Sequence, residues 1–141
     1  MLAEIAERCN TIEESYEFML AYAAQGLPTD SGSQSGGQIR EYLRRAGNAM
    51  RGLKESCAKA LQQERLESGE HYEAFFKVLI RDAADSFAAI ELVLTQPAIS
   101  SQLIDNLNAS IHLRALLTDL FLLTEIAKPQ PMPAKPAAFG G

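Results

Sequence analysis

The stretch QIREYLRRAGNAMRGLKESCAKAL, residues 38–61, carries apolar residues three or four positions apart along its whole length. This spacing places the apolar side chains on one face of an α-helix. The face consists of Ile39, Tyr42, Leu43, Ala46, Met50, Leu53, Cys57, Ala60 and Leu61. Ser35 and Gln38 resemble a helix-capping box before it, and Gly69 can end it by adopting the left-handed conformation. The sequence therefore predicts a helix over residues 38–67.

The segments on both sides of this helix show the same periodicity. Residues 2–25 and 98–127 each predict an amphipathic helix, and residues 70–95 predict a helix whose apolar surface is wider than one face. Glycine, serine and proline in residues 26–37 predict a flexible loop, and no stretch alternates as a β-strand does. We therefore predict an all-α domain, residues 1–127, folded as an antiparallel up-down-up-down four-helix bundle.

The C-terminal stretch KPQPMPAKPAAFGG, residues 128–141, differs in composition from the rest of the chain. Its prolines recur at every second or third position, which is incompatible with a helix interior. Such a composition is typical of an extended, polyproline-like or disordered segment. We therefore predict a proline-rich tail that does not join the core.

The composition indicates which classes of protein are improbable. The chain has 141 residues, of which 47% are hydrophobic, so one domain can bury a core without disulfides or a metal. The formal net charge of −5 disfavours nucleic-acid binding. The N-terminal MLAEIAERC has acids where a signal peptide carries lysines, and no apolar run is long enough to span a bilayer. We expect a cytoplasmic protein.

A basic flank runs along the predicted helix 38–67 and consists of Arg40, Arg44 and Arg51. The predicted first helix carries acids on its own flank, which are Glu7, Glu14 and Glu17. Because neighbouring antiparallel helices align such flanks, we predict salt bridges between them. One alternative is an arginine-lined groove for phosphate or RNA, although the stretch lacks the interleaved aromatic residues of single-strand binders. Another alternative is a surface for an acidic protein.

The cysteines and histidines bear on metal and redox chemistry. Di-iron bundles need Glu-x-x-His motifs, but Ser68 and Ala109 stand three residues before His71 and His112, so we predict no metal and no cofactor. The antiparallel register brings the thiols of Cys9 and Cys57 to the same level. We interpret this proximity as a shared core layer, with a redox or soft-metal pair as the alternative.

A polar stretch, residues 100–114, occupies the first half of the predicted fourth helix. Asn108 and His112 are four residues apart and can touch, and Asp105 extends the same surface. Asp105, His112 and Asp119 lie seven residues apart on one stripe. The stripe is either a solvated face of the helix or part of a patch for a ligand or partner. Arg114 falls among leucines, so we predict that it pairs with Asp82 or reaches across a subunit interface. The candidate patch consists of Asp105, Asn108, His112 and Arg114.

The second half of the predicted fourth helix is apolar on nearly all sides. A second apolar stripe consists of Leu113, Leu116, Leu120 and Leu123. One buried face suffices for a bundle helix, so we predict that this stripe is a contact surface for a homodimer or a protein partner.

These observations favour a non-enzymatic interaction, accessory or regulatory protein that self-associates through the fourth helix. No residues form a recognisable catalytic set. One alternative is a small-ligand or thiol-redox module that uses either Cys9 with Cys57 or Asn108 with His112. A weaker alternative is nucleic-acid binding through the basic flank.

Overall fold

A computed structural model describes residues 3–63 and 68–128 of the chain. The helices are α1 (Ala3–Ala23), α2 (Gln34–Gln63), α3 (Gly69–Leu94), α4 (Ser101–Ala109) and α5 (Ile111–Ala127). All regular secondary structure in these two ranges is helical, which confirms the predicted all-α class. Apart from Lys128, the predicted proline-rich tail lies outside the described residues.

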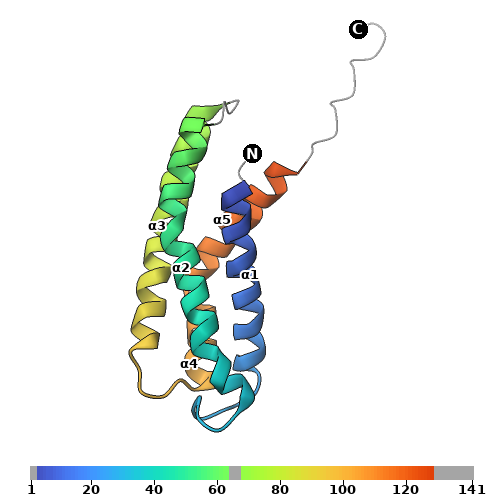
Figure 1. The fold of residues 1–141 in the computed structure, drawn as a ribbon, viewed down its shortest axis with the longest axis vertical. Coiled ribbons are helices and arrows are strands. Elements are labelled where there is room, and N and C mark those ends of the chain that lie inside the picture. Colours follow the sequence, from blue (N-terminus) through green and yellow to red (C-terminus); the bar gives the residue numbers. More distant parts are fainter. Residues whose placement is uncertain (1–2, 64–67, 129–141) are drawn as a thin grey trace, which may run out of the picture.

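The helices lie alongside one another, and successive long helices run in opposite directions (Figure 1). α2 packs against both α1 and α3, α3 also packs against α5, and α4 packs against α1. The loops 24–33 and 95–100 meet at one end of the molecule, which we call the loop end. At the opposite end, which we call the terminal end, α1 and α3 begin and α5 finishes.

The core consists of the apolar faces that the periodicity predicts. In α1 the fully buried residues include Ile5, Cys9, Ile12 and Met19, and in α2 they include Ile39, Leu43, Leu53 and Cys57. The widely apolar α3 buries Phe76, Leu79, Ala83 and Ile90, and leaves Leu92 exposed. Burial of a large apolar side chain contributes about 1.5–3 kcal/mol, so these faces supply the main drive to fold.

The predicted helix 98–127 is wrong in two respects, because it begins only at Ser101, after the cap Ser100, and because it is interrupted at Ser110. This residue is extended, with φ −60° and ψ 141°, and its hydroxyl accepts a hydrogen bond from the Leu113 amide. A serine side chain can replace the backbone partner of a helix start, so Ser110 ends α4 and caps α5. Residues on the two sides of Ser110 therefore do not share one continuous helical face.

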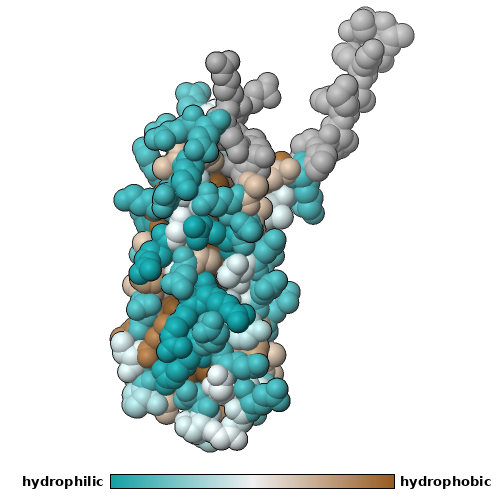
Figure 2. Space-filling model, viewed as in Figure 1, coloured by the Kyte–Doolittle hydropathy of each residue, from teal (hydrophilic) through white to brown (hydrophobic). Residues whose placement is uncertain are grey.

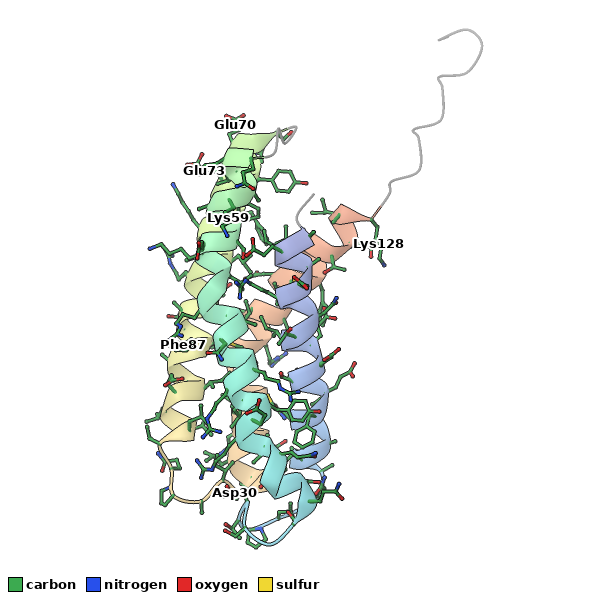
Figure 3. The ribbon with its side chains drawn as sticks, in the orientation of Figure 1. Asp30, Lys59, Glu70, Glu73, Phe87 and Lys128 are labelled. Carbon is green, nitrogen blue, oxygen red and sulfur yellow. The ribbon has the colours of Figure 1, made fainter. Side chains whose placement is uncertain are left out.

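The loop between α1 and α2 was predicted to be flexible, but hydrogen bonds hold it against the loop between α3 and α4. The Asp30 carboxylate accepts from Arg40 Nε and from the Ile99 amide, both at 2.8 Å. Arg40 also donates to the carbonyl oxygens of Leu94, at 3.0 Å, and Gln96, at 2.8 Å. Arg40 is thus a structural residue that joins three segments, and Figure 3 shows its partner Asp30 at the loop end.

Two buried side chains complete this network, which we call the loop clamp (Tyr22, Asp30, Arg40, Ile99 and Ser101). The Tyr22 hydroxyl donates to the Ile99 carbonyl at 2.6 Å, and the Ser101 hydroxyl donates to the Tyr22 carbonyl at 2.6 Å. The Leu27 amide donates to the Ser101 hydroxyl at 2.9 Å. Burial and the negative charge of Asp30 raise the pKa of Tyr22, with Arg40 opposing them, so its phenol stays protonated as a donor.

Two adjacent glycines in α2 allow a test of how closely this loop packs. A Cβ added to Gly36 would collide with the Asp30 carbonyl oxygen, whereas a Cβ added to Gly37 meets nothing within 4 Å. We expect Gly36→Ala to lower the free energy of unfolding by about 1–3 kcal/mol. Gly37→Ala should raise it by up to about 1 kcal/mol, because alanine favours a helix. Urea denaturation measures both, and similar effects of the two variants would contradict the close contact.

Candidate functional site

An apolar groove of about 490 Å³ lies at the terminal end, between the first turns of α3 and the last turns of α5. We call it the end groove. Its lining residues are Ser68, His71, Tyr72 and Phe75 on one side and Leu122, Leu123 and Ile126 on the other. Figure 1 shows that the last turns of α5 lie toward the start of α1 and away from the tips of α2 and α3. This divergence separates the two walls.

The groove walls are built from the outer margins of two buried helix faces. On α3, Phe76 is buried and its ring lies 5.9 Å from that of Tyr72, which is only half-buried, as is Phe75. On α5, Leu123 is buried, while 49% of Leu122 is exposed. The core thus fixes Phe76 and Leu123, and their neighbours are held at the surface of the groove.

The last two turns of α5 carry exposed large apolar side chains in close succession. The exposed fractions are 53% for Phe121, 49% for Leu122 and 46% for Ile126. Most of the face in Figure 2 is hydrophilic, and one of its apolar areas lies near the end of α5. Contiguous apolar surface beside a groove is typical of a protein contact site.

Charged side chains lie at the ends of the two helices that form the groove, but none of them lines it. Glu70 lies at the start of α3, Glu73 points to the side of α3 away from α5, and Lys128 follows the end of α5 (Figure 3). Lys128 forms an ion pair with Glu125 at 3.0 Å, and His71 Nε2 lies 3.8 Å from a Glu70 carboxylate oxygen. With three carboxylates and one lysine, these helix ends carry the same negative sign as the chain.

The predicted polar patch is not brought together. Asp105, His112 and Arg114 are exposed, whereas Asn108 is buried and donates a hydrogen bond to the Met19 carbonyl at 3.1 Å. The prediction fails because Ser110 interrupts the helix between Asn108 and His112, so their four-residue spacing no longer places them on one face. Asn108 instead anchors α4 to α1.

The predicted Arg114–Asp82 pair is also wrong. Arg114 is exposed, and the side chain that interacts with Asp82 is Asp119, which is only 9% exposed although it was expected at the surface. Burial, then a hydrogen bond with Asp82 and its negative charge, raise the pKa of Asp119 to about 7. The Asp119 Oδ2 atom has no partner among the described residues. Asp82 and Asp119 line neither the end groove nor the cavity between α1 and the end of α5. We therefore interpret the pair as a structural contact between α3 and α5.

The predicted contact stripe on the fourth helix lies in the core. Leu113, Leu116, Leu120 and Leu123 are at most 4% exposed. They face inward because α5 packs against α3 after the break at Ser110. The exposed apolar side of the same helix is formed by Phe121, Leu122 and Ile126. Periodicity identified the apolar half of the helix but assigned its outward face to the wrong residues.

Two of the three arginines in the basic flank of α2 contact segments other than α1. Arg40 belongs to the loop clamp, and the Arg51 guanidinium lies 5.8 Å from the Phe87 ring centroid of α3. Arg44 is exposed. An ion pair between α1 and α2 instead joins Glu4 and Lys59, at 3.8 Å. The three arginines thus occupy three different environments and form no continuous surface for an anion.

Cys9 and Cys57 are free and buried, with 3% and 1% of their surfaces exposed. Burial, followed by the charge of Glu13, raises the pKa of Cys9 to about 11. Burial, followed by the charge of Cys9, raises the pKa of Cys57 to about 12. The two thiols thus lie near enough to interact, but both are protonated at neutral pH. Protonated, buried thiols are poor nucleophiles, which disfavours the redox alternative.

Among residues 3–63 and 68–128, no group of three or more histidine, cysteine or acidic side chains could hold a metal ion. None of the helices described is both long and apolar enough to cross a membrane. Comparison of the chain with protein families, with curated proteins and with solved structures finds no match.

Proposed function

We propose that this protein is a non-enzymatic interaction protein, in which an up-down-up-down helical bundle presents the end groove to an apolar, basic segment of a partner. The observation that carries the proposal is the end groove itself. Its walls are aromatic and aliphatic and include the half-exposed Leu122, and the chain that carries it has a formal net charge of −5. A protein that binds a partner segment and catalyses no reaction would have an accessory or regulatory role.

The walls supply the kind of contact that concentrates binding energy. Aromatic side chains are enriched at the energetically important positions of interfaces, and grooves of this type accept apolar side chains from a helix or an extended peptide. Tyr72 and Phe75 are already held by the packing of α3, so little side-chain entropy is lost when a partner binds. The groove volume of about 490 Å³ accommodates several apolar side chains.

The negative charge of the chain favours a partner segment of opposite sign. Glu70 and Glu73 are exposed at the start of α3, and the chain as a whole has a formal net charge of −5. Opposite charges at the rim of an interface speed association and disfavour partners of the same sign. A segment with lysine or arginine beside its apolar residues therefore suits this groove, and an acidic one does not.

A pair of synthetic peptides tests this function. One contains leucine, phenylalanine and lysine, and the other has glutamate in place of each lysine. We expect the lysine peptide to shift the amide resonances of Tyr72, Phe75 and Leu122, and the glutamate peptide to bind at least about tenfold more weakly. Leu122→Glu should weaken binding of the lysine peptide to a similar extent, because it places a charge on the apolar wall.

The matched control is Leu92→Glu, since Leu92 is 66% exposed but lies on α3 near the loop end. This variant should bind the lysine peptide as the wild type does. Equal binding of both peptides, or shifts that lie away from the groove, would contradict the proposal. Light scattering of the same samples shows whether a second copy is the occupant; a dimer that Leu122→Glu dissociates would place self-association at this end of α5.

A further inference from the structure

We propose that the C-terminal segment of the chain itself, residues 129–141, occupies the end groove and competes with the partner segment. This inference rests on the proposed function, because it assigns a regulator to the same groove. Its grounds are the place where the segment begins, its length, and the match between its composition and the groove.

The segment follows Lys128, which lines a neighbouring cavity between α1 and the end of α5, and it is long enough to reach the groove and lie along it. Leu122 and Ile126 form one wall, and Lys128 follows within the next turn of the same helix. With a rise of about 1.5 Å per residue, Leu122 and Lys128 are about 9 Å apart along the axis. A polyproline helix extends about 3.1 Å per residue, so the thirteen residues from 129 to 141 span up to about 40 Å. The segment can therefore turn back and pass along the groove.

The chain leaves α5 in a suitable conformation. Lys128 has φ −65° and ψ 148°, which are close to polyproline II values. The following Pro129 favours this conformation in the residue before it. Polyproline II segments bind aromatic-lined grooves at a low entropic cost, because they are already extended before they bind. Tyr72 and Phe75 provide such a lining.

The composition of the segment matches what the groove selects. It contains Met132 and Phe139 as apolar side chains, Lys135 as its charged residue, and no acid. Lys135 is opposite in sign to the formal net charge of −5 that the whole chain carries. This is the apolar and basic chemistry that we propose for the partner segment.

Covalent attachment favours the chain's own segment over a free one. A short tether gives an effective concentration of about millimolar, so even weak intrinsic affinity fills the groove for much of the time. A partner then binds with an apparent affinity reduced by the fraction of chains whose groove is empty. The segment would thus act as an internal competitor that only a tighter-binding partner displaces.

A spin label in the full-length chain tests this proposal. Because Cys9 and Cys57 are buried and protonated, the engineered cysteine of Ala138→Cys can be labelled selectively. A labelled, ¹⁵N-enriched chain diluted with unlabelled chain reports contacts within one molecule. We expect line broadening at the amides of Tyr72 and Phe75, and none at Asp30 in the loop end. No broadening in the groove would overturn the proposal.

A second sample reports contacts between molecules, and contains a ¹⁵N chain without the label mixed with labelled chain at natural abundance. Broadening in this sample alone would overturn the intramolecular assignment, because the segment would then bind a second copy. The triple variant Met132→Ser/Lys135→Glu/Phe139→Ser should abolish the broadening within one chain. It should also tighten binding of the lysine peptide by about threefold or more.

The two proposals fail in distinguishable ways. If the lysine peptide binds the groove equally well with the intact and the triple-variant segment, the competition is wrong and the binding function stands. If neither chain binds the peptide, the binding function is wrong. In that case broadening in the diluted sample would reduce the groove to a contact between α3, α5 and the C-terminal segment, and competition with a partner would be wrong as well.

Discussion

Arg40→Ala is expected to lower the free energy of unfolding at pH 7 by about 2–4 kcal/mol. The substitution removes hydrogen bonds to the Asp30 carboxylate, at 2.8 Å, and to the Leu94 and Gln96 carbonyl oxygens, at 3.0 and 2.8 Å. It leaves the Asp30 carboxylate, whose side chain is 13% exposed, without its cation. The loop between α1 and α2 would then lose its main attachment to the loop between α3 and α4. Urea denaturation followed by circular dichroism measures the change.

Arg45→Ala is the matched control, because the Arg45–Glu41 pair lies in the same helix but is more than half exposed. An exposed pair of this kind contributes about 0.3–0.5 kcal/mol. Equal effects of the two substitutions would show that the loop clamp adds no more than a surface ion pair.

The effect of Arg40→Ala should also depend on pH. Burial alone would raise the pKa of Asp30, but hydrogen bonds from the Ile99 amide and Arg40, together with the Arg40 charge, lower it below the usual value. A lowered pKa stabilises the fold at pH values above that of the unfolded chain, about 4 for aspartate. This contribution is lost as the pH falls through the lowered value, so the difference between the wild type and Arg40→Ala should shrink in acid to what the bonds to the Leu94 and Gln96 carbonyls contribute.

Asp119→Asn is expected to raise the free energy of unfolding at pH 8 by about 1–3 kcal/mol. At this pH the wild type holds a buried, ionised Asp119 beside Asp82, and asparagine removes the charge while keeping the shape. The amide nitrogen can also donate to the Asp82 carboxylate. At pH 5 the effect should be small, because the pKa of Asp119, about 7, keeps the wild-type carboxyl protonated there.

The raised pKa of Asp119 also predicts how the free energy of unfolding depends on pH. The folded state binds a proton at Asp119 up to about pH 7, whereas unfolded aspartate releases it near pH 4. The contribution of Asp119 to the free energy of unfolding should therefore be greatest below pH 4. It should decline between pH 4 and 7 and stay constant above pH 7. Asp119→Asn should lack this decline. Asp85→Asn, at an exposed position of α3, is the control that should retain it. A decline that persists in Asp119→Asn would assign it to other groups.

The sequence predicts α1 and α3 well because their apolar spacing is uninterrupted. α1 lies within the predicted 2–25, and α3 matches 70–95 to within one residue at each end. The predicted start of α2 is wrong, since this helix begins at Gln34, four residues before the predicted 38–67, and therefore includes Ser35 and Gln38. The left-handed residue before α3 is Ser68, with φ 57°, and not Gly69.

The fourth helix failed at Ser110, since the spacing of apolar residues continues across it. The break depends on one hydroxyl accepting from the Leu113 amide, and serine occurs in helices as well as at their ends.

The candidate site was less predictable, because periodicity shows which residues share a face but not which neighbour covers that face. Tyr72, Phe75 and Leu122 belong to the predicted apolar segments 70–95 and 98–127, yet their exposure depends on the angle between α5 and α3. The same limit explains why Asp119, expected at the surface, is buried and why Leu116 and Leu120 are core residues. Arg40 was read as part of a charged flank, since its three partners lie at sequence distances that no local pattern reveals.

Because Ser110 is extended, α5 can run in a direction different from that of α4. Leu122 stands twelve residues beyond Ser110, about 18 Å along the helix axis. A change of about 10° in the direction of α5 at this point would move the groove wall by about 3 Å. This is about a third of the distance of about 8–10 Å between the axes of two packed helices. The loop clamp lies on the other side of Ser110 and need not rearrange. The width of the groove therefore depends on the packing of Leu113, Leu116 and Leu120 in the core, which fixes the direction of α5.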